Sequence, residues 1–387
     1  MPNKDEMALD NSLHQDVHPG VAGAATAGPP GDEHVRDTGV GTMQRSRIPR
    51  PARSPLELAL RTLNAGPLFI VIALIVLMSL LSPYFLTERN IQNLSAQTSI
   101  IAALAIGQFF VILLRGVDIS VGSTVGLVGV VGATAATWSW TSGWSVVVVM
   151  LLVGAAVGAV NGGFIVKGRL PQPLIVTLAT LGIVRGIALV ISDGDTLVTI
   201  PPLVDALGND FVGPIPVPAL IVGIVAVVAW VFATRTQWGR WIYAVGGDPQ
   251  AASRLGIPAA RVEFSCYVFC GLMAALAGLI IAGRTHAGTA ASGSLLELDA
   301  ITAAIIGGVS LAGGRGNVAN MVAGALVLGV IRNGLDLLDV SPFWQIIAIG
   351  CIVIAALELD VLRRALENKL RVRRAEQHAF AHGAASA

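Results

Sequence analysis

The chain has 387 residues, of which 54% are hydrophobic and only 13% are charged, and it contains 44 glycines. An ordinary globular domain carries about 25% charged residues, so this composition, with a mean hydropathy of +0.73, excludes most classes of soluble enzyme and indicates a membrane protein. The formal net charge is +1, which gives no reason to expect a nucleic acid as partner.

Residues 1–55 are rich in Pro, Gly, Asp and His and contain few apolar side chains. Such a segment cannot bury enough apolar surface to offset the entropy lost on ordering, so we expect a disordered tail. The first long apolar run begins near Pro67, too late for the apolar part of a secretory signal. We therefore expect the tail to stay in the cytoplasm.

Ten apolar segments follow in the predicted membrane domain, residues 56–366. They are 67–85, 95–114, 119–138, 144–166, 173–192, 217–234, 263–283, 300–312, 318–338 and 343–359. A helix needs about 20 residues to cross the hydrocarbon, so nine segments are long enough, whereas 300–312 could be re-entrant. The predicted fold is an all-α, polytopic helical bundle of about ten transmembrane helices.

The distribution of basic residues favours ten crossings with both termini in the cytoplasm. In that topology the inside stretches hold most of the 25 Lys and Arg residues, including the basic tail 367–387. The outside loop 193–216 holds four Asp and no basic residue. This asymmetry is the one that the positive-inside rule predicts.

A faint internal duplication divides the ten segments into two halves of opposite orientation. Asn161-Gly162 ends the fourth segment and precedes Pro171, while Asn333-Gly334 falls late in the ninth and precedes Pro342. Inverted five-helix repeats of this kind are common in transporters, although Asn-Gly followed by Pro is also ordinary in loops. The many glycines of the third and fourth segments are best explained as faces for close helix packing.

The loop 235–262 contains a predicted short helix. Asp248 can cap its free amides, Pro249 suits its first position and Gly256 can end it. A two-turn helix at the membrane surface, with Ala251 and Ala252 beside Leu255, suits docking into a groove of another protein, but an ordinary interhelical loop would have the same spacing.

Sequence motifs of enzymes are missing. There is no GxxxxGK[ST] loop for ATP, no HExxH zinc motif and no GxSxG nucleophile elbow. The three cysteines are Cys266, Cys270 and Cys351, and none belongs to a CxxC pair. We therefore expect no catalytic residue, no metal site and no cofactor bound by this chain.

A few polar residues lie in or beside the apolar segments and could line or gate a pathway. Asp118 could cap the third helix or pair with Arg115 at an inner gate. Arg185 could pair with Asp193, Asp195, Glu297 or Asp299, or its side chain could extend outward to the membrane surface. Gln108 and Asn161 could bind a polar solute, although hydrogen bonds between helices are the simpler explanation for each. The complete set of gate or pathway candidates is Gln108, Arg115, Asp118, Asn161, Arg185, Asp299 and Asn333.

Four blocks, in order, resemble the ribose/xylose-type permease subunits of bacterial ABC importers. Residues 115–123 (RGVDISVGS) resemble the family's Gly-Ile-Asp-Leu-Ser-Val-Gly-Ser signature, and 180–186 (TLGIVRG) resemble the next block. Residues 246–257 resemble its Gly-Gly-Asn-x-x-Ala-Ala-x-x-x-Gly-Ile segment, and 298–316 resemble a further block. The likeness covers roughly residues 90–360. Two features depart from it: the long N-terminal tail, and Asp248-Pro249 where Asn and a non-Pro residue are usual.

The resemblance implies a multi-pass permease of the bacterial inner membrane that dimerises with a second permease copy. It implies that a cytoplasmic ATPase subunit, which itself binds ATP and Mg²⁺, contacts a coupling helix, and that an extracytoplasmic binding protein delivers a monosaccharide. The coupling residues would be Gly246, Gly247, Asp248, Pro249, Ala251, Ala252, Leu255 and Gly256, with the three glycines as hinges.

Three alternatives stay open at this point. The first is a permease of the related branched-chain amino acid group. The second is an ion-coupled secondary carrier, which usually needs carboxylates inside the membrane, whereas those here lie at segment ends. A membrane enzyme is disfavoured by the missing His or carboxylate cluster.

Overall fold

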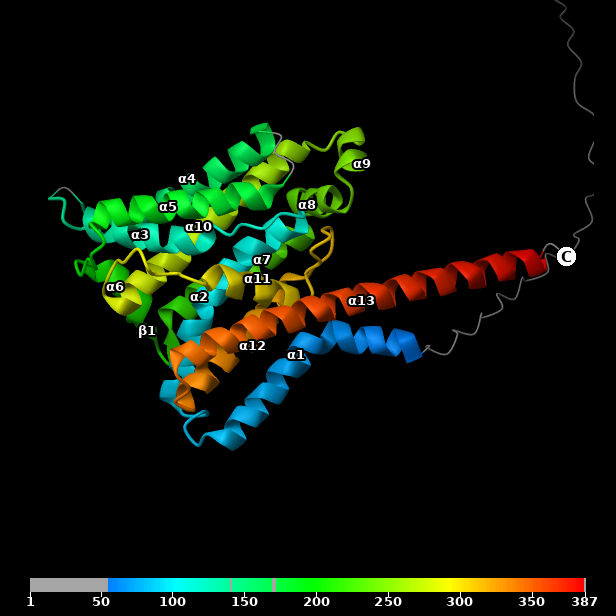
Figure 1. The fold of residues 1–387 in the computed structure, drawn as a ribbon, viewed down its shortest axis with the longest axis horizontal. Helices are drawn as coiled ribbons and strands as arrows, with labels where there is room; N and C mark the ends of the chain where they lie inside the picture. Colours follow the sequence, from blue (N-terminus) through cyan, green and yellow to red (C-terminus); the bar gives the residue numbers. More distant parts are fainter. Residues whose placement is uncertain (1–54, 140, 169–171, 386–387) are drawn as a thin grey trace, which may run out of the picture. The chain divides into compact units, whose positions relative to one another are not determined.

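The computed structural model describes residues 55–139, 141–168 and 172–385, so the predicted tail lies outside the described residues except for residue 55. Within these ranges the chain forms thirteen helices and one hairpin (Figure 1). The helices are α1 (Pro55–Leu81), α2 (Glu88–Leu113), α3 (Val121–Ala135), α4 (Gly143–Gly168), α5 (Pro173–Ser192), α6 (Pro202–Asn209), α7 (Val217–Arg235), α8 (Gln237–Gly247), α9 (Pro249–Arg254), α10 (Ala259–Thr285), α11 (Leu296–Ile306), α12 (Val318–Leu337) and α13 (Pro342–Ala385). The antiparallel strands β1 (Phe211–Val212) and β2 (Ile215–Pro216) follow α6.

Each predicted apolar segment overlaps one helix, which confirms the all-α polytopic fold. In the described part of the chain, six helices are long and apolar enough to cross a membrane, namely α2, α4, α5, α7, α10 and α12. Shorter apolar helical stretches occupy Gly66–Leu81, Val121–Ala135 and Pro342–Glu358. The number of complete crossings therefore stays a prediction.

The helices α3 and α11 are short, and each follows an irregular segment. With 11 residues, α11 is about 16 Å long, roughly half the hydrocarbon thickness. It ends at Ile306 rather than near residue 312 because glycines follow, and Gly308 has a φ of +77° that a helix cannot contain. These two helices are the third members of the two predicted halves, so the discontinuity recurs where an inverted repeat would place it.

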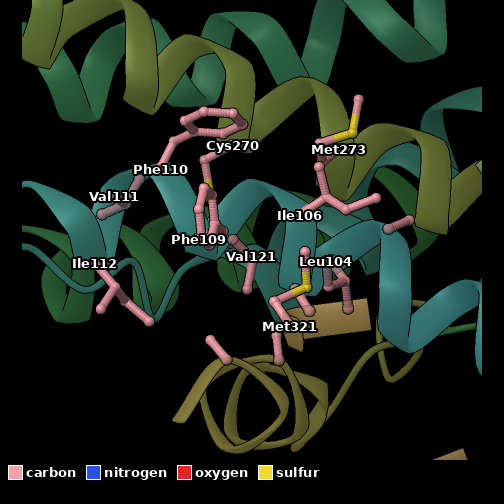
Figure 2. Close-up of a cluster of buried hydrophobic side chains, with 14 of the residues drawn as sticks. Leu104, Ile106, Phe109, Phe110, Val111, Ile112, Val121, Cys270, Met273 and Met321 are labelled. Carbon is pink, nitrogen blue, oxygen red and sulfur yellow. The ribbon is translucent and has the colours of Figure 1, made fainter. Parts of the chain in front are cut away.

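The helix α2 lies at the centre of the bundle. Its most apolar 18-residue window is 94% buried, against 28% for α4 and α5 and 22% for α7. In Figure 2, α2 presents Phe109 beside Cys270 of α10 on one side, while Leu104 lies near Met321 of α12 on another. The poorly buried helices carry exposed apolar residues such as Leu152 and Val228, which suits contact with lipid.

Glycines bring α4 and α10 into backbone contact. A Cβ atom at Gly158 would overlap the carbonyl oxygen of Tyr267, and one at Gly154 would overlap that of Gly271. Gly271 in turn leaves no room for a Cβ against the carbonyl oxygen of Gly154. The prediction that glycines of the fourth segment form a helix-packing face is confirmed.

Two elements extend beyond the predicted segments. Residues 237–247, expected to belong to a loop, form the helix α8, which Thr236 caps by accepting a hydrogen bond from the amide of Gly239 at 3.0 Å. The basic segment 367–387 belongs to the helix α13 as far as Ala385.

Candidate functional site

The predicted coupling helix is α9, and its boundaries follow the local sequence signals. Asp248 Oδ1 accepts hydrogen bonds from the amides of Gln250 at 2.9 Å and Ala251 at 3.0 Å, while Pro249 occupies the first helical position. Gly256 follows the helix with a φ of +80°, a left-handed conformation that glycine adopts without strain. Asp248 also ends α8, so α8 and α9 meet at one residue.

The eight predicted coupling residues divide into an exposed and a buried group. Leu255 is 82% exposed, an unusual state for a leucine at the end of a surface helix, and Ala251 beside it is exposed as well. Ala252 is only 3% exposed and Gly246 is buried against the end of α2. Ala251 and Leu255 can therefore touch another protein, whereas Ala252 and Gly246 hold the helix against its own chain.

Arg115 connects the coupling segment with the loop that joins α2 to α3. Its Nε donates a hydrogen bond to the carbonyl oxygen of Gly246 at 2.9 Å, and its Nη2 donates to the carbonyl oxygen of Gly247. These carbonyls belong to the last turn of α8, where a cation also complements the helix dipole. Arg115 itself has a φ of +67°, a strained conformation for an arginine.

A second contact ties the same region to the loop between α11 and α12. The hydroxyl of Tyr243 donates a hydrogen bond to the carbonyl oxygen of Gly316 at 2.9 Å, and burial raises the pKa of this hydroxyl. The amide of Gly314 donates to the carbonyl oxygen of Leu113, the last residue of α2, at 2.8 Å. The helix α8 is thus attached to the loop that precedes α3 and to the loop that follows α11.

Gln108, Asp118 and Asn161 form one buried polar cluster together with Ser120. The Asp118 carboxylate accepts hydrogen bonds from the Ser120 amide at 2.9 Å, from the Ser120 hydroxyl at 2.6 Å, and from Asn161 Nδ2 at 3.2 Å. Asn161 Nδ2 also donates to Ser120 Oγ at 2.8 Å. Gln108 accepts from the amide of Asp118 at 3.3 Å and donates to its carbonyl oxygen. The cluster joins α2, the start of α3 and α4.

The structure separates Asp118 from Arg115, although their spacing allows a pair. Asp118 is 1% exposed and its carboxylate is occupied by neutral donors, whereas Arg115 is exposed and binds the end of α8. The inner-gate pair is therefore wrong for this conformation. Three neutral donors can hold a buried carboxylate in place without an arginine.

Two arginines at the predicted outer half of the bundle have different partners. Arg185 Nη1 donates to the carbonyl oxygen of Ser292 at 3.2 Å and interacts electrostatically with Glu297, one of its four predicted carboxylate candidates. Asp299, another candidate, forms an ion pair with Arg332 at 2.5 Å instead. This pair fastens α11 to α12.

Asn333 pairs with Asn90 of α2 in a reciprocal amide contact. Asn90 Nδ2 donates to Asn333 Oδ1 at 2.9 Å, and Asn333 Nδ2 donates to Asn90 Oδ1 at 2.8 Å. Asn90 also donates to the carbonyl oxygen of Phe85 at 2.8 Å, at the turn between α1 and α2. The contact therefore joins α2 to α12 at the end of the bundle opposite α9.

The buried gate and pathway candidates each have at least one polar partner within the chain, although Asn161 Oδ1 and Asp299 Oδ1 accept no hydrogen bond from the described residues. Gln108, Asp118, Asn161, Asp299 and Asn333 are each at most 1% exposed, so none of them faces an open pathway in this conformation. They join helices to one another.

Sequence reasoning missed three of their partners, which are Ser120, Arg332 and Asn90, and it also missed Tyr243, which binds the loop after α11. Arg332 could have been found, because a basic residue beside Asn333 in an apolar segment needs a carboxylate. In the described part of the chain, no group of three or more His, Cys, Asp or Glu could hold a metal ion.

Comparison with known proteins identifies relatives over most of the chain. Residues 90–357 match the family described as "Branched-chain amino acid transport system / permease component". No solved structure matches.

Three curated relatives show which proteins the chain is similar to. It is 38% identical to the ribose import permease protein RbsC of Haemophilus influenzae, over 75% of this chain and 90% of the relative. It is 36% identical to the D-allose transport system permease protein AlsC of Escherichia coli K12, over 84% of this chain and 99% of the relative. It is 33% identical to the xylose transport system permease protein XylH of the same strain, over 78% of this chain and 93% of the relative.

Proposed function

Since the chain belongs to the family of branched-chain amino acid transport system permease components, we propose that it is the membrane permease subunit of an ATP-driven ABC importer for a monosaccharide. The observation that carries this proposal is the likeness to ribose, allose and xylose permeases over at least three quarters of this chain and nine tenths of each relative. The apolar helices and the polytopic fold agree with it.

The mechanism begins at the exposed face of α9. A separate ATPase subunit, which supplies ATP and Mg²⁺, contacts Ala251 and Leu255 from the cytoplasm. ATP-driven closure of that subunit displaces α9 together with α8, because Asp248 ends one helix and caps the other. Arg115 and Tyr243 transmit the displacement to the loop before α3 and to the loop after α11. Movement of these two short helices then opens the pathway alternately to either side of the membrane.

The remaining partners complete the transporter. An extracytoplasmic binding protein delivers the sugar and sets specificity, and a second permease copy, identical or a sister subunit, forms the other half of the pore. Both termini lie in the cytoplasm of a bacterial cell with an inner membrane, as the distribution of basic residues predicts.

A branched-chain amino acid importer is the second candidate, because the family description names that substrate class. An ion-coupled carrier is disfavoured, since the buried Asp299 is neutralised by Arg332 and Asp118 is fully engaged by neutral donors. A coupling carboxylate has to be free to take up and release its ion.

Reconstitution in liposomes tests the proposal. The permease is combined with its cognate ATPase and binding protein, and uptake of labelled ribose, xylose, allose and leucine is measured with ATP either inside or outside the liposomes. We expect uptake of at least one sugar that requires ATP on the α9 side and the binding protein on the other. Uptake of leucine alone would support the second candidate, and uptake by the permease alone, driven by an ion gradient, would refute both.

The variant Leu255→Asp locates the ATPase contact. We expect it to abolish copurification of the ATPase, because a charge cannot enter the apolar groove that Leu255 occupies. Val198→Asp changes an equally exposed apolar residue of the loop 193–216, on the opposite side of the membrane in the proposed topology, and serves as the matched control. Copurification that survives Leu255→Asp would contradict the role of α9.

A further inference from the structure

A cavity of about 590 Å³ opens at the end of the bundle opposite α9. It lies between the turn that joins α1 to α2, the first turns of α2, and the end of α10, with α6 and the hairpin beside them. The first residue of α2, Glu88, marks this end, whereas its last residue, Leu113, contacts Gly314 and the coupling segment. The 26 residues of α2 separate the two ends by about 39 Å. In the proposed topology the cavity therefore opens outside the cell.

Amide side chains dominate the polar wall of this cavity. Gln92, Asn93 and Asn209 line it together with Arg89 and Arg284. Arg284 Nη2 donates to Asn93 Oδ1 at 3.0 Å, and Gln92 Nε2 makes only long contacts, at 3.3 Å, to Glu88 and to the carbonyl oxygen of Pro214. Among the described residues, none donates a hydrogen bond to Gln92 Oε1 and none accepts one from Asn93 Nδ2. An acceptor and a donor are thus left for a ligand.

The wall of the cavity is held in place. Asn209 Nδ2 donates to the carbonyl oxygen of Gly283 at 2.8 Å and to Asp205 at 2.8 Å. A Cβ at Gly208 would overlap the backbone at Arg284, so α6 and α10 are in direct backbone contact. A site whose polar groups are already positioned loses less entropy when it binds a ligand.

Two exposed aromatic residues supply the apolar part of the lining. Tyr84 is 67% exposed and Phe211 is 52% exposed, and both border the cavity. A ligand with polar groups at its edges and apolar C–H faces can pack its faces against these aromatic rings while its edges form hydrogen bonds with the amide side chains of the wall. The volume also lies within the range of about 300–1,000 Å³ that is usual for small-molecule sites.

The chemistry of the lining favours a neutral, hydroxyl-rich ligand. The residues that border the cavity in the described part of the chain include no Asp or Glu and two arginines, of which Arg284 donates to Asn93 while Arg89 is exposed. Guanidinium N–H groups can donate to hydroxyl oxygens as well as to anions. A hydroxyl both donates and accepts, as an amide does, whereas an inorganic anion accepts only and would leave Gln92 Oε1 unused. The exposure of the site predicts weak binding, which a pathway needs so that the solute can leave.

We propose that this outer cavity, which Gln92, Asn93, Asn209, Arg284, Tyr84 and Phe211 border, is a low-affinity monosaccharide site that receives the sugar before it enters the pathway. The inference rests on the proposed function and adds a site on the permease itself. The site recognises the sugar through hydrogen bonds from the amides and through contact of the sugar ring with Tyr84 and Phe211.

Binding of free sugar to the permease, without the binding protein, tests the inference. The permease and its ATPase are placed in lipid nanodiscs, and saturation-transfer NMR is recorded with D-ribose, D-xylose and D-allose in turn at millimolar concentrations. We expect transfer to the transported sugar, and a loss of affinity of about tenfold in Gln92→Ala and in Asn93→Ala, because each removes one hydrogen-bonding group. Gln172→Ala changes an exposed amide at the start of α5, outside the lining, and leaves transfer unchanged.

The outcomes separate this inference from the proposed function. ATP-driven uptake is measured on the same preparations, with elution of the variants as folded complexes checked by size-exclusion chromatography. If uptake occurs but transfer is absent, or is equal in Gln92→Ala, Asn93→Ala and the unaltered chain, the site is refuted and the importer stands. Transfer that sulfate or gluconate abolishes but a second neutral sugar does not would also refute the site. If no sugar is taken up, the proposed function fails and the site fails with it.

Discussion

Asp118 and Asn161 depend on each other because a buried carboxylate needs donors and a buried amide needs acceptors. Asn161→Asp would put a second carboxylate about 3 Å from the first, where their repulsion is poorly screened. We expect a loss of about 1–3 kcal/mol in the free energy of unfolding, followed as the midpoint of thermal unfolding in detergent. Adding Asp118→Asn restores one donor and one acceptor and should return most of the loss. Equal midpoints for Asn161→Asp and the unaltered chain would contradict the contact.

Arg115 offers a test of transmission that leaves assembly intact. Arg115→Ala removes two hydrogen bonds to the end of α8, while the exposed face of α9 is untouched. We expect the ATPase to copurify as before, transport to fall at least tenfold, and ATP hydrolysis to lose its stimulation by the loaded binding protein. Arg261→Ala, at an exposed arginine near the start of α10, serves as the control. Transport by Arg115→Ala at the normal rate would contradict the transmission role.

The partner of a residue could be predicted from the sequence where it lies close by in the chain, but not where the contact joins distant segments. Asp248 could be assigned as a cap because its partners are two and three residues away. Arg115 meets Gly246 across 131 positions, and Asn161 meets Asp118 across 43, so no spacing rule could pair them. The sequence identified these residues as unusual, and the fold supplies their partners.

The contact between α4 and α10 can be tested with two glycines of one helix. Gly158 lies against the backbone of α10, whereas a Cβ added at Gly163 would meet no atom of the described residues within 4 Å. We expect Gly158→Val to abolish a monodisperse peak in size-exclusion chromatography, because the helices cannot separate without exposing polar backbone. Gly163→Val should elute as the unaltered chain does. The reverse order of effects would contradict this packing.

Helices were predicted well where apolar length alone defines them and poorly where polar residues belong to the helix. The helix α2 begins at Glu88, whereas its start was predicted at residue 95. The first turns were missed because they are polar and lie outside the apolar run; in the fold they border the outer cavity. The helix α8 was missed because its residues do not form an apolar run, although Thr236 gives a capping signal.

The orientation of the whole molecule can be measured with single cysteines. Cys266 and Cys270 are buried and Cys351 is exposed, so the three are replaced by serine or alanine to give a background without thiols. Thr199→Cys in the loop 193–216 and Ser253→Cys in α9 are both exposed positions. We expect a membrane-impermeant maleimide to label the former in intact spheroplasts and the latter only after lysis. Labelling of Ser253→Cys in intact cells would invert the topology.

At the scale of the whole molecule, composition was enough to predict a helical membrane bundle, and motif order was enough to indicate the family. Neither could show where α11 ends, since apolar residues resume after the two glycines that break the helix at Ile306 and continue as far as Ala312. Neither could locate the outer cavity, whose walls come from segments far apart in the chain.

The backbone contact between α4 and α10 also has a consequence for hydrogen–deuterium exchange. Amides on either side of Gly158 and Gly271 lie where neither water nor a side chain fits between the helices. They should be among the slowest to exchange, and they should stay so whether or not ATP is being hydrolysed, since sub-global opening starts in regions with fewer buried contacts. This helix pair therefore provides a fixed internal reference against which exchange in α3, α9 and α11 can be compared during the transport cycle.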